Sequence, residues 1–185
     1  MPGVGEAPIK ASPTADALFS AVIDYLEKRP DVDPKRIGIL GRSFGGYWAT
    51  KMAYAEAERL RASVVWGGGV HYFFQEDWLR ESTNADSYLM DHDIARCRLF
   101  GVSNLDELVK PWAALSLKEQ GWLEKPCCPM LIVNGKNDLQ TPIADLYILL
   151  EYGAPKSARV FPGAHMGQTP QTFPTIVTWL KHELA

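Results

Sequence analysis

The stretch that decides the fold is Arg36-Ile37-Gly38-Ile39-Leu40-Gly41-Arg42-Ser43-Phe44-Gly45-Gly46. Residues 36–40 form an apolar run that is too short for a helix and lacks polar alternation, which is typical of a strand buried on both faces. Residues 44–58 favour a helix. The sharp turn from strand to helix therefore falls on the Gly-x-Ser-x-Gly pattern of residues 41–45.

The position of this pattern indicates a nucleophilic serine. A strand that turns abruptly into a helix lifts the serine hydroxyl clear of the sheet, and flanking glycines remove Cβ atoms that would clash across the turn. The N-terminus of the following helix also directs N–H groups toward the place where an oxyanion would form. We therefore predict that Ser43 is a nucleophile. The alternative is glycine-rich packing of a helix against its strand.

Further strands and helices alternate along the rest of the chain. The first helix is expected to begin at Ser12 and Pro13 and to stop before Pro30. Buried apolar runs follow at residues 62–66, 130–134 and 158–161, with helices at residues 141–153 and 172–184. This alternation predicts an α/β fold, in which helices flank both faces of a parallel sheet. The whole chain, residues 1–185, is expected to be one domain.

Residues 72–123 interrupt the alternation. They are far more numerous than a crossover requires, so we predict a helical cap inserted into the domain, with helical segments at residues 86–100 and 105–109. The insertion holds eight aromatic residues. Their rings either only attach the insertion to the core or line an apolar pocket above the strand ends.

A base and an acid follow the last two strands. Asp138 comes after residues 130–134, and His165 comes after residues 158–161. Loops at the carboxyl ends of parallel strands share one edge of the sheet, so both residues can meet Ser43 there. A serine needs a base, and the base needs an orienting acid. The sequence thus predicts a Ser43-Asp138-His165 triad.

Four other residues are rivals for these roles. Asp145 falls on the helix after Thr141 and is expected at the helix surface, and His182 is expected to face solvent on the last helix. His92 lies between two aspartates, which is typical of an exposed histidine without a role. His71 follows a triple glycine at the end of the second strand, so it is either a substrate contact or a packing residue.

Composition excludes several classes of function. The net charge is −3, so there is no basic surplus for a nucleic acid. No run approaches the roughly 18 apolar residues of a membrane span, and the N-terminus resembles no export signal, which favours a cytoplasmic protein. The three cysteines cannot all pair, the four histidines lie far apart in the sequence, and no nucleotide motif extends the triple glycine. We expect no metal and no cofactor.

The nucleophile, acid and histidine, in this order, resemble the α/β-hydrolase superfamily. Residues 66–74, 87–90 and 133–138 are similar to the FrsA-like esterase branch, whose relatives include pseudooxynicotine-type and polyketide-shortening hydrolases. The resemblance implies that Ser43 is the nucleophile, His165 the general base and Asp138 its orienting acid. It also implies that the backbone N–H of Phe44 is one oxyanion donor.

The resemblance covers the C-terminal half of such a fold. Residues 1–8 are similar to the loop after the fourth of the usual eight strands, so we expect a truncated domain without the first strands. The loop that supplies a second oxyanion donor would then be absent. Residues 36–40 would form an apolar sheet edge, through which the chain is expected to dimerise or aggregate.

These patterns lead to one main expectation and two rivals. The main one is a serine hydrolase that cleaves carboxylic esters or ketone-flanked carbon-carbon bonds in a small molecule. The rivals are a catalytically idle fragment of a hydrolase and an acyltransferase on the same fold. The sequence does not distinguish between the two kinds of substrate bond.

Overall fold

The centre of the computed structural model, which describes residues 1–84 and 91–185, is a four-stranded parallel sheet in the order β1-β2-β3-β4. The strands are β1 (Gly38–Arg42), β2 (Ala62–Trp66), β3 (Met130–Gly135) and β4 (Ser157–Phe161). Each strand pairs with the next one along the chain, from Gly38 opposite Ala62 to Gly135 opposite Phe161. All four carboxyl ends therefore lie at one edge of the sheet.

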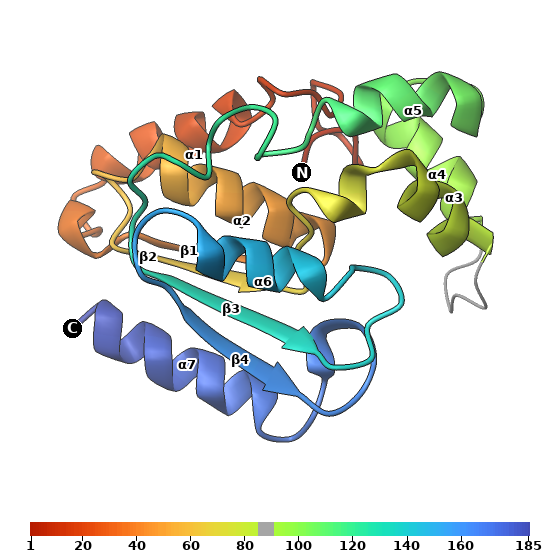
Figure 1. Cartoon of the computed structure of the whole chain (residues 1–185). Helices are drawn as coiled ribbons and strands as arrows, with labels where there is room; N and C mark the ends of the chain where they lie inside the picture. The colour runs from red at the N-terminus through yellow and green to blue at the C-terminus, as the bar shows by residue number, and fades with distance from the viewer. Residues whose placement is uncertain (85–90) are drawn as a thin grey trace.

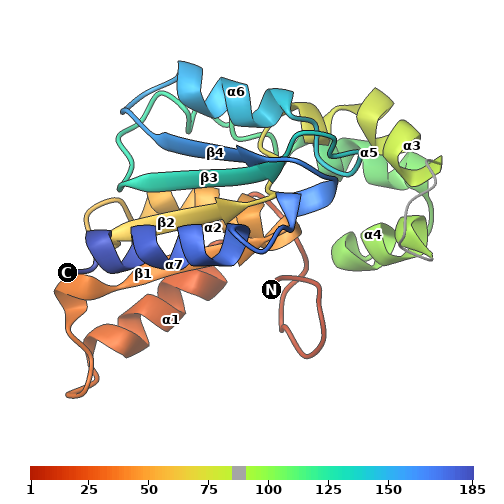
Figure 2. The ribbon, with the colours of Figure 1, turned by 90° about the horizontal axis from the view of Figure 1, so that it is seen from below.

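Helices cover both faces of this sheet, as predicted. Helices α1 (Ala17–Glu27), α2 (Phe44–Ala55) and α6 (Ala144–Glu151) lie on one face, and α7 (Thr172–Glu183) lies on the other (Figure 1). Figure 2 shows α7 in front of the sheet and α1 beyond β1 at its edge. The strands and helices that alternate along the sequence therefore form a sheet with helices packed on both of its faces.

The two middle strands match their predictions, but the outer strands β1 and β4 do not. Of the buried run expected at residues 158–161, only Phe161 is buried. All residues of β2 and β3 are buried, whereas β1 is an outer strand on which Leu40 is 38% exposed. Residues 34–36 form a short 3₁₀ helix, η1 (Pro34–Arg36), so β1 starts at Gly38 and continues to Arg42. A strand was predicted at residues 36–40, but its bounds and its burial on both faces were wrong, because an outer strand is covered less completely than the strands inside the sheet.

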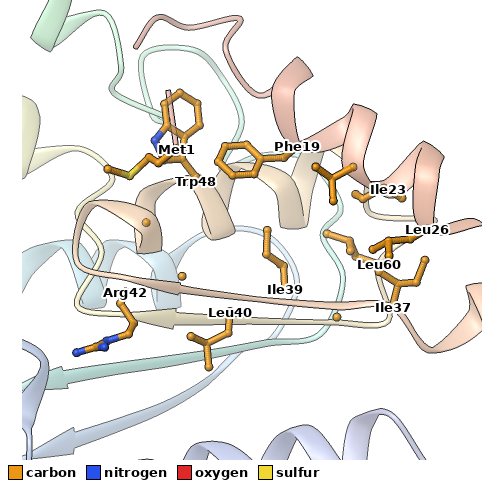
Figure 3. Close-up of a pocket in the computed structure, with 14 residues that line it drawn as sticks. Met1, Phe19, Ile23, Leu26, Ile37, Ile39, Leu40, Arg42, Trp48 and Leu60 are labelled. Atoms are coloured by element: carbon orange, nitrogen blue, oxygen red, sulfur yellow. The ribbon is translucent and has the colours of Figure 1, made fainter. Parts of the chain in front are cut away.

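Helix α1 also differs from its prediction. It begins at Ala17 rather than at Ser12, and it buries Ile23 toward the core. Val22, an apolar residue of this helix, is 52% exposed, because α1 extends past β1. A groove of about 300 Å³ lies between α1 and β1, where Phe19 and Ile39 face each other across it (Figure 3).

The insertion between β2 and β3 is helical and lies at the carboxyl ends of the strands (Figures 1 and 2). It contains η2 (Tyr72–Phe74), α3 (Glu76–Asn84), α4 (His92–Phe100) and α5 (Leu105–Ala113). The first part of the helix expected at residues 86–100, and the whole family-like segment at residues 87–90, lie outside the described residues. The second predicted helix continues four residues past Val109, with Pro111 inside it.

Several hydrogen bonds attach this insertion to the rest of the chain, and three of them come from different parts of it. Trp78 donates its indole N–H to the carbonyl of Gln140 at 3.1 Å, beside the loop that follows β3. The backbone N–H of Ala11 donates to the carbonyl of Leu99 at 2.9 Å, and that of Leu117 donates to the carbonyl of Val70 at 2.8 Å. These contacts help to hold the inserted helices over the strand ends. None of the helices in the described ranges is long and apolar enough to cross a membrane.

Candidate active site

Ser43 occupies a strained turn between β1 and α2. Its φ of 52° and ψ of −126° lie in a region that residues with a side chain rarely adopt. The turn is held by two backbone hydrogen bonds, from the Ser43 N–H to the carbonyl of Trp66 at 2.8 Å and from the Gly46 N–H to the carbonyl of Ser43 at 2.7 Å. This backbone conformation places the Ser43 hydroxyl within hydrogen-bond distance of the His165 side chain.

Two of the neighbouring glycines are required by close contact, and one is not. A Cβ on Gly41 would overlap the carbonyl of Gly45, and a Cβ on Gly46 would lie 2.7 Å from the Cα of Gly68. A Cβ on Gly45 would meet nothing within 4 Å. The expectation that the flanking glycines relieve clashes holds for Gly41 and Gly46, but it is wrong for Gly45.

The loop after β4 presents His165. Its backbone is fixed by Asn134, whose side-chain oxygen accepts the N–H of Met166 at 3.1 Å and the N–H of Gly135 at 2.8 Å. The indole of Trp66 donates to the carbonyl of Met166 at 2.6 Å. Contacts from β2 and β3 thus hold the strained Met166, whose φ is 65°, and orient the preceding imidazole.

Ser43, His165 and Asp138 form a continuous hydrogen-bonded chain. The Nε2 of His165 lies 2.8 Å from the Oγ of Ser43, and its Nδ1 lies 2.8 Å from the Oδ2 of Asp138. The other carboxylate oxygen of Asp138 accepts the N–H groups of Gln140 at 2.8 Å and Thr141 at 3.1 Å. The Asp138 side chain is fully buried and that of His165 nearly so, so water competes little for these bonds. The three predicted residues therefore meet at the strand ends.

Phe44, the predicted oxyanion donor, is the first residue of α2. The N–H groups of a first helical turn have no partner within the helix, and the helix dipole favours negative charge there. This is the geometry expected of a donor beside Ser43. The Phe44 ring packs against the core, where it stacks on the rings of Tyr47 and Trp112.

A cavity of about 250 Å³ opens beside Ser43 beneath the inserted helices. Its apolar walls come from both the core and the insertion, and its polar groups are Ser43, His92, Arg96, Gln140 and Thr141. The remaining lining residues are Met1, Phe44, Phe73, Ala95, Leu99 and Trp112. Some of the aromatic residues of the insertion therefore line a pocket, as one of the two interpretations of the sequence proposed.

His71 and His182 are placed differently from one another. His71 shares a 2.8 Å hydrogen bond between its Nδ1 and the Oγ of Ser116, and it is not among the residues that line the cavity beside Ser43. Burial and the charge of Lys118 lower the pKa of His71. His182 is exposed on α7, as expected, with its side chain 84% accessible.

The expectations for His92 and Asp145 were wrong. His92 lines the cavity with Ser43 instead of facing solvent, and burial lowers its pKa to about 4. Asp145 is fully buried, and it accepts the backbone N–H groups of His71, Tyr72 and Phe73 at 2.8–2.9 Å. Burial raises the pKa of Asp145 to about 6, although these hydrogen bonds oppose the rise. Asp145 thus anchors the start of the insertion.

Arg96 is a charged residue of the cavity that the sequence did not indicate. It lies four positions after His92 on α4, so both side chains project from the same helix face. That spacing was the available signal, but the charged residues around it, Asp91, Asp93 and Arg98, are typical of a solvated surface. Arg96 is only 3% exposed.

The parallel sheet, the strained serine turn and the order of serine, acid and histidine define the α/β-hydrolase class. A family profile described as "Esterase FrsA-like" matches residues 1–185. The chain belongs to this family of FrsA-like esterases.

Individual relatives support this assignment over part of their length. The chain is 31% identical over 150 residues to Esterase FrsA of Photorhabdus laumondii, a match that covers 77% of the chain and 34% of that protein. It is 28% identical to Esterase FrsA of Photobacterium profundum, over all of the chain and 44% of that protein. A crystal structure of 2,6-dihydroxy-pseudo-oxynicotine hydrolase superposes with a TM-score of 0.82 at 26% identity, over all of the chain and 51% of that structure. The chain thus spans about half or less of the length of these relatives.

Proposed function

We propose that the chain carries the catalytic residues of a serine hydrolase that cleaves carboxylic esters of small molecules. The observation that carries the proposal is the hydrogen-bonded chain from the Ser43 hydroxyl through His165 to the buried Asp138. The membership of the FrsA-like esterase family supports the same reaction class. The three free cysteines of the described structure favour a reducing compartment such as the cytoplasm.

In the proposed reaction, the Oγ of Ser43 attacks the ester carbonyl while the Nε2 of His165 takes the hydroxyl proton. Asp138 stays ionised and stabilises the imidazolium through its hydrogen bond to Nδ1. The N–H of Phe44 donates to the oxygen of the tetrahedral intermediate. His165 then protonates the leaving alcohol, and the same residues activate a water that hydrolyses the acyl-enzyme.

A ketone-flanked carbon-carbon bond is the second candidate substrate. The likeness to 2,6-dihydroxy-pseudo-oxynicotine hydrolase favours it, because this structure superposes over the whole chain. The first step would be the same attack on a carbonyl. The leaving group would be a carbanion stabilised by its neighbouring ketone, and it would take the proton from His165. Hydrolysis of a 1,3-diketone, followed by chromatography of the acid and ketone products, distinguishes this reaction from ester cleavage.

The test of the main proposal is active-site labelling with a fluorophosphonate and turnover of 4-nitrophenyl butyrate. The unmodified chain is expected to be labelled at Ser43, and Ser43→Ala should lose both the label and the turnover. His165→Ala should lower kcat by at least about a thousandfold, because residues of a triad act as a unit. His182→Ala is the matched control, since that histidine is exposed on α7.

Two results would contradict the proposal. Full turnover by His165→Ala would remove the assigned base, and a chain that is folded but neither labelled nor active would favour the idle fragment. Addition of an alcohol acceptor separates hydrolysis from acyl transfer, because an acyltransferase would form a new ester in place of the free acid.

A further inference from the structure

Arg96 is a buried cation inside the cavity that holds Ser43. It is 3% exposed, and its guanidinium lies 5.1 Å from the ring centre of Trp112 and 5.5 Å from that of Phe73. Both rings line the same cavity of about 250 Å³. The charge therefore lies against the apolar wall that a substrate would touch.

The hydrogen-bond partners of Arg96 among the described residues are neutral oxygens. Its Nη1 donates to the Oγ of Ser82 at 2.9 Å and to the carbonyl of Leu79 at 3.3 Å. In the parts of the chain that the structure describes, residues 1–84 and 91–185, no carboxylate forms an ion pair with it. An arginine has five N–H donors in a planar fork that matches a carboxylate. Burial lowers its pKa to about 10, which leaves it charged at neutral pH.

His92 adds a polar group to the same wall. It precedes Arg96 by one helical turn, and its Nδ1 is buried without a hydrogen-bond partner among the described residues. A buried polar group without a partner is costly unless a ligand supplies one. The imidazole is neutral near pH 7, so it can donate or accept one hydrogen bond without adding charge.

We propose that Arg96 binds a carboxylate on the acyl group of the substrate, so that the chain prefers short hemi-esters of dicarboxylic acids to neutral esters. The inference rests on the proposed function, since it assigns the acyl side of the Ser43 site. A compact cavity favours a short acyl chain. A carboxylate would pair with the guanidinium, as a buried charge requires. His92 offers this group a second hydrogen bond.

The test compares two 4-nitrophenyl esters of similar shape, the hemisuccinate and the neutral 4-methylpentanoate. We expect kcat/KM for the hemisuccinate to be at least tenfold higher, and we expect Arg96→Met to reduce this ratio at least tenfold through KM. Arg96→Lys keeps the charge but loses the fork, so its ratio should be intermediate. If Arg96 only attached α4 to the two aromatic rings, its substitution would lower kcat/KM for both esters by the same factor.

A binding measurement separates this inference from the proposed function. In Ser43→Ala, which does not consume the ester, monoethyl succinate should quench tryptophan fluorescence at concentrations at least tenfold lower than ethyl 4-methylpentanoate does. The difference should vanish in the double variant with Arg96→Met. Selective binding without turnover would contradict only the hydrolase, whereas equal turnover of both esters would overturn only the role of Arg96. If Arg96→Met does not fold, the wild type and Arg96→Lys decide the question.

Discussion

At Gly41, the backbone of β1 passes against the first turn of α2 without room for a side chain. Its Cβ would overlap the carbonyl of Gly45, and the backbone cannot yield as a flexible side chain could. We expect Gly41→Ala to lower the free energy of unfolding by about 3 kcal/mol or more, in the range of other overpacked core substitutions. Urea unfolding followed by circular dichroism measures the loss.

Gly45 provides the matched control within the same motif. Its Cβ would enter open space, and alanine is the better helix former. Gly45→Ala should therefore stay within about 1 kcal/mol of the wild type and retain fluorophosphonate labelling of Ser43. If Gly45→Ala were as damaging as Gly41→Ala, the close-contact explanation of the motif would be wrong.

The residues of the triad could be predicted because each follows a strand, and the topology brings strand ends together. His92, Arg96 and Asp145 could not, because their burial depends on how the insertion folds over the sheet. Local sequence showed only charged neighbours around His92 and an apolar helix around Asp145. The cavity that surrounds the first two is a tertiary property, since its walls come from α2, η2, α4 and α5.

Between elements, Asp145 on α6 anchors η2 by accepting three backbone N–H groups, and this contact makes stability depend on pH. Its pKa is about 6 in the fold, against an ordinary value of 3.8. The folded chain therefore binds more protons than the unfolded chain between these values. The contribution is fully present below about pH 4 and is lost as pH rises to about 6. We expect this carboxyl to lower stability by on the order of 3 kcal/mol across that range.

Asp145→Asn tests this effect, because the amide does not titrate. Unfolding midpoints in urea at pH 4 and pH 6.5 should differ less in the variant than in the wild type. The variant should be less stable at both values, since its NH₂ group would face the N–H donors of η2. An unchanged difference between the two pH values would show that other groups cause the pH dependence.

Among the elements, β2 and β3 were predicted well because strands buried on both faces read as unbroken apolar runs. The bounds of β1 and α1 were predicted less well. One side of each faces away from the core, so apolar residues such as Leu40 and Val22 are partly exposed and no longer mark the inner face. Periodicity therefore located these two elements without defining their ends or their faces.

At the scale of the whole molecule, β1 and α1 leave an apolar groove along one edge of the sheet (Figure 3). Among the described residues, β1 pairs only with β2, so its outer N–H and carbonyl groups lack strand partners. Leu40 from β1 and Val22 from α1 line the groove and are partly exposed. We propose that β1 of a second copy pairs with this edge across a two-fold axis, which would join the two sheets into one.

Light scattering after size-exclusion chromatography tests this prediction on the unmodified chain. We expect twice the mass of one chain for the wild type and a single-chain mass for Leu40→Lys, because a charge on an edge strand opposes pairing. Tyr147→Lys is the control: Tyr147 is 53% exposed on α6, away from β1, and the variant should remain a dimer. A wild type that elutes as a monodisperse monomer would contradict pairing through β1. A dimer that persists in Leu40→Lys would place the interface elsewhere.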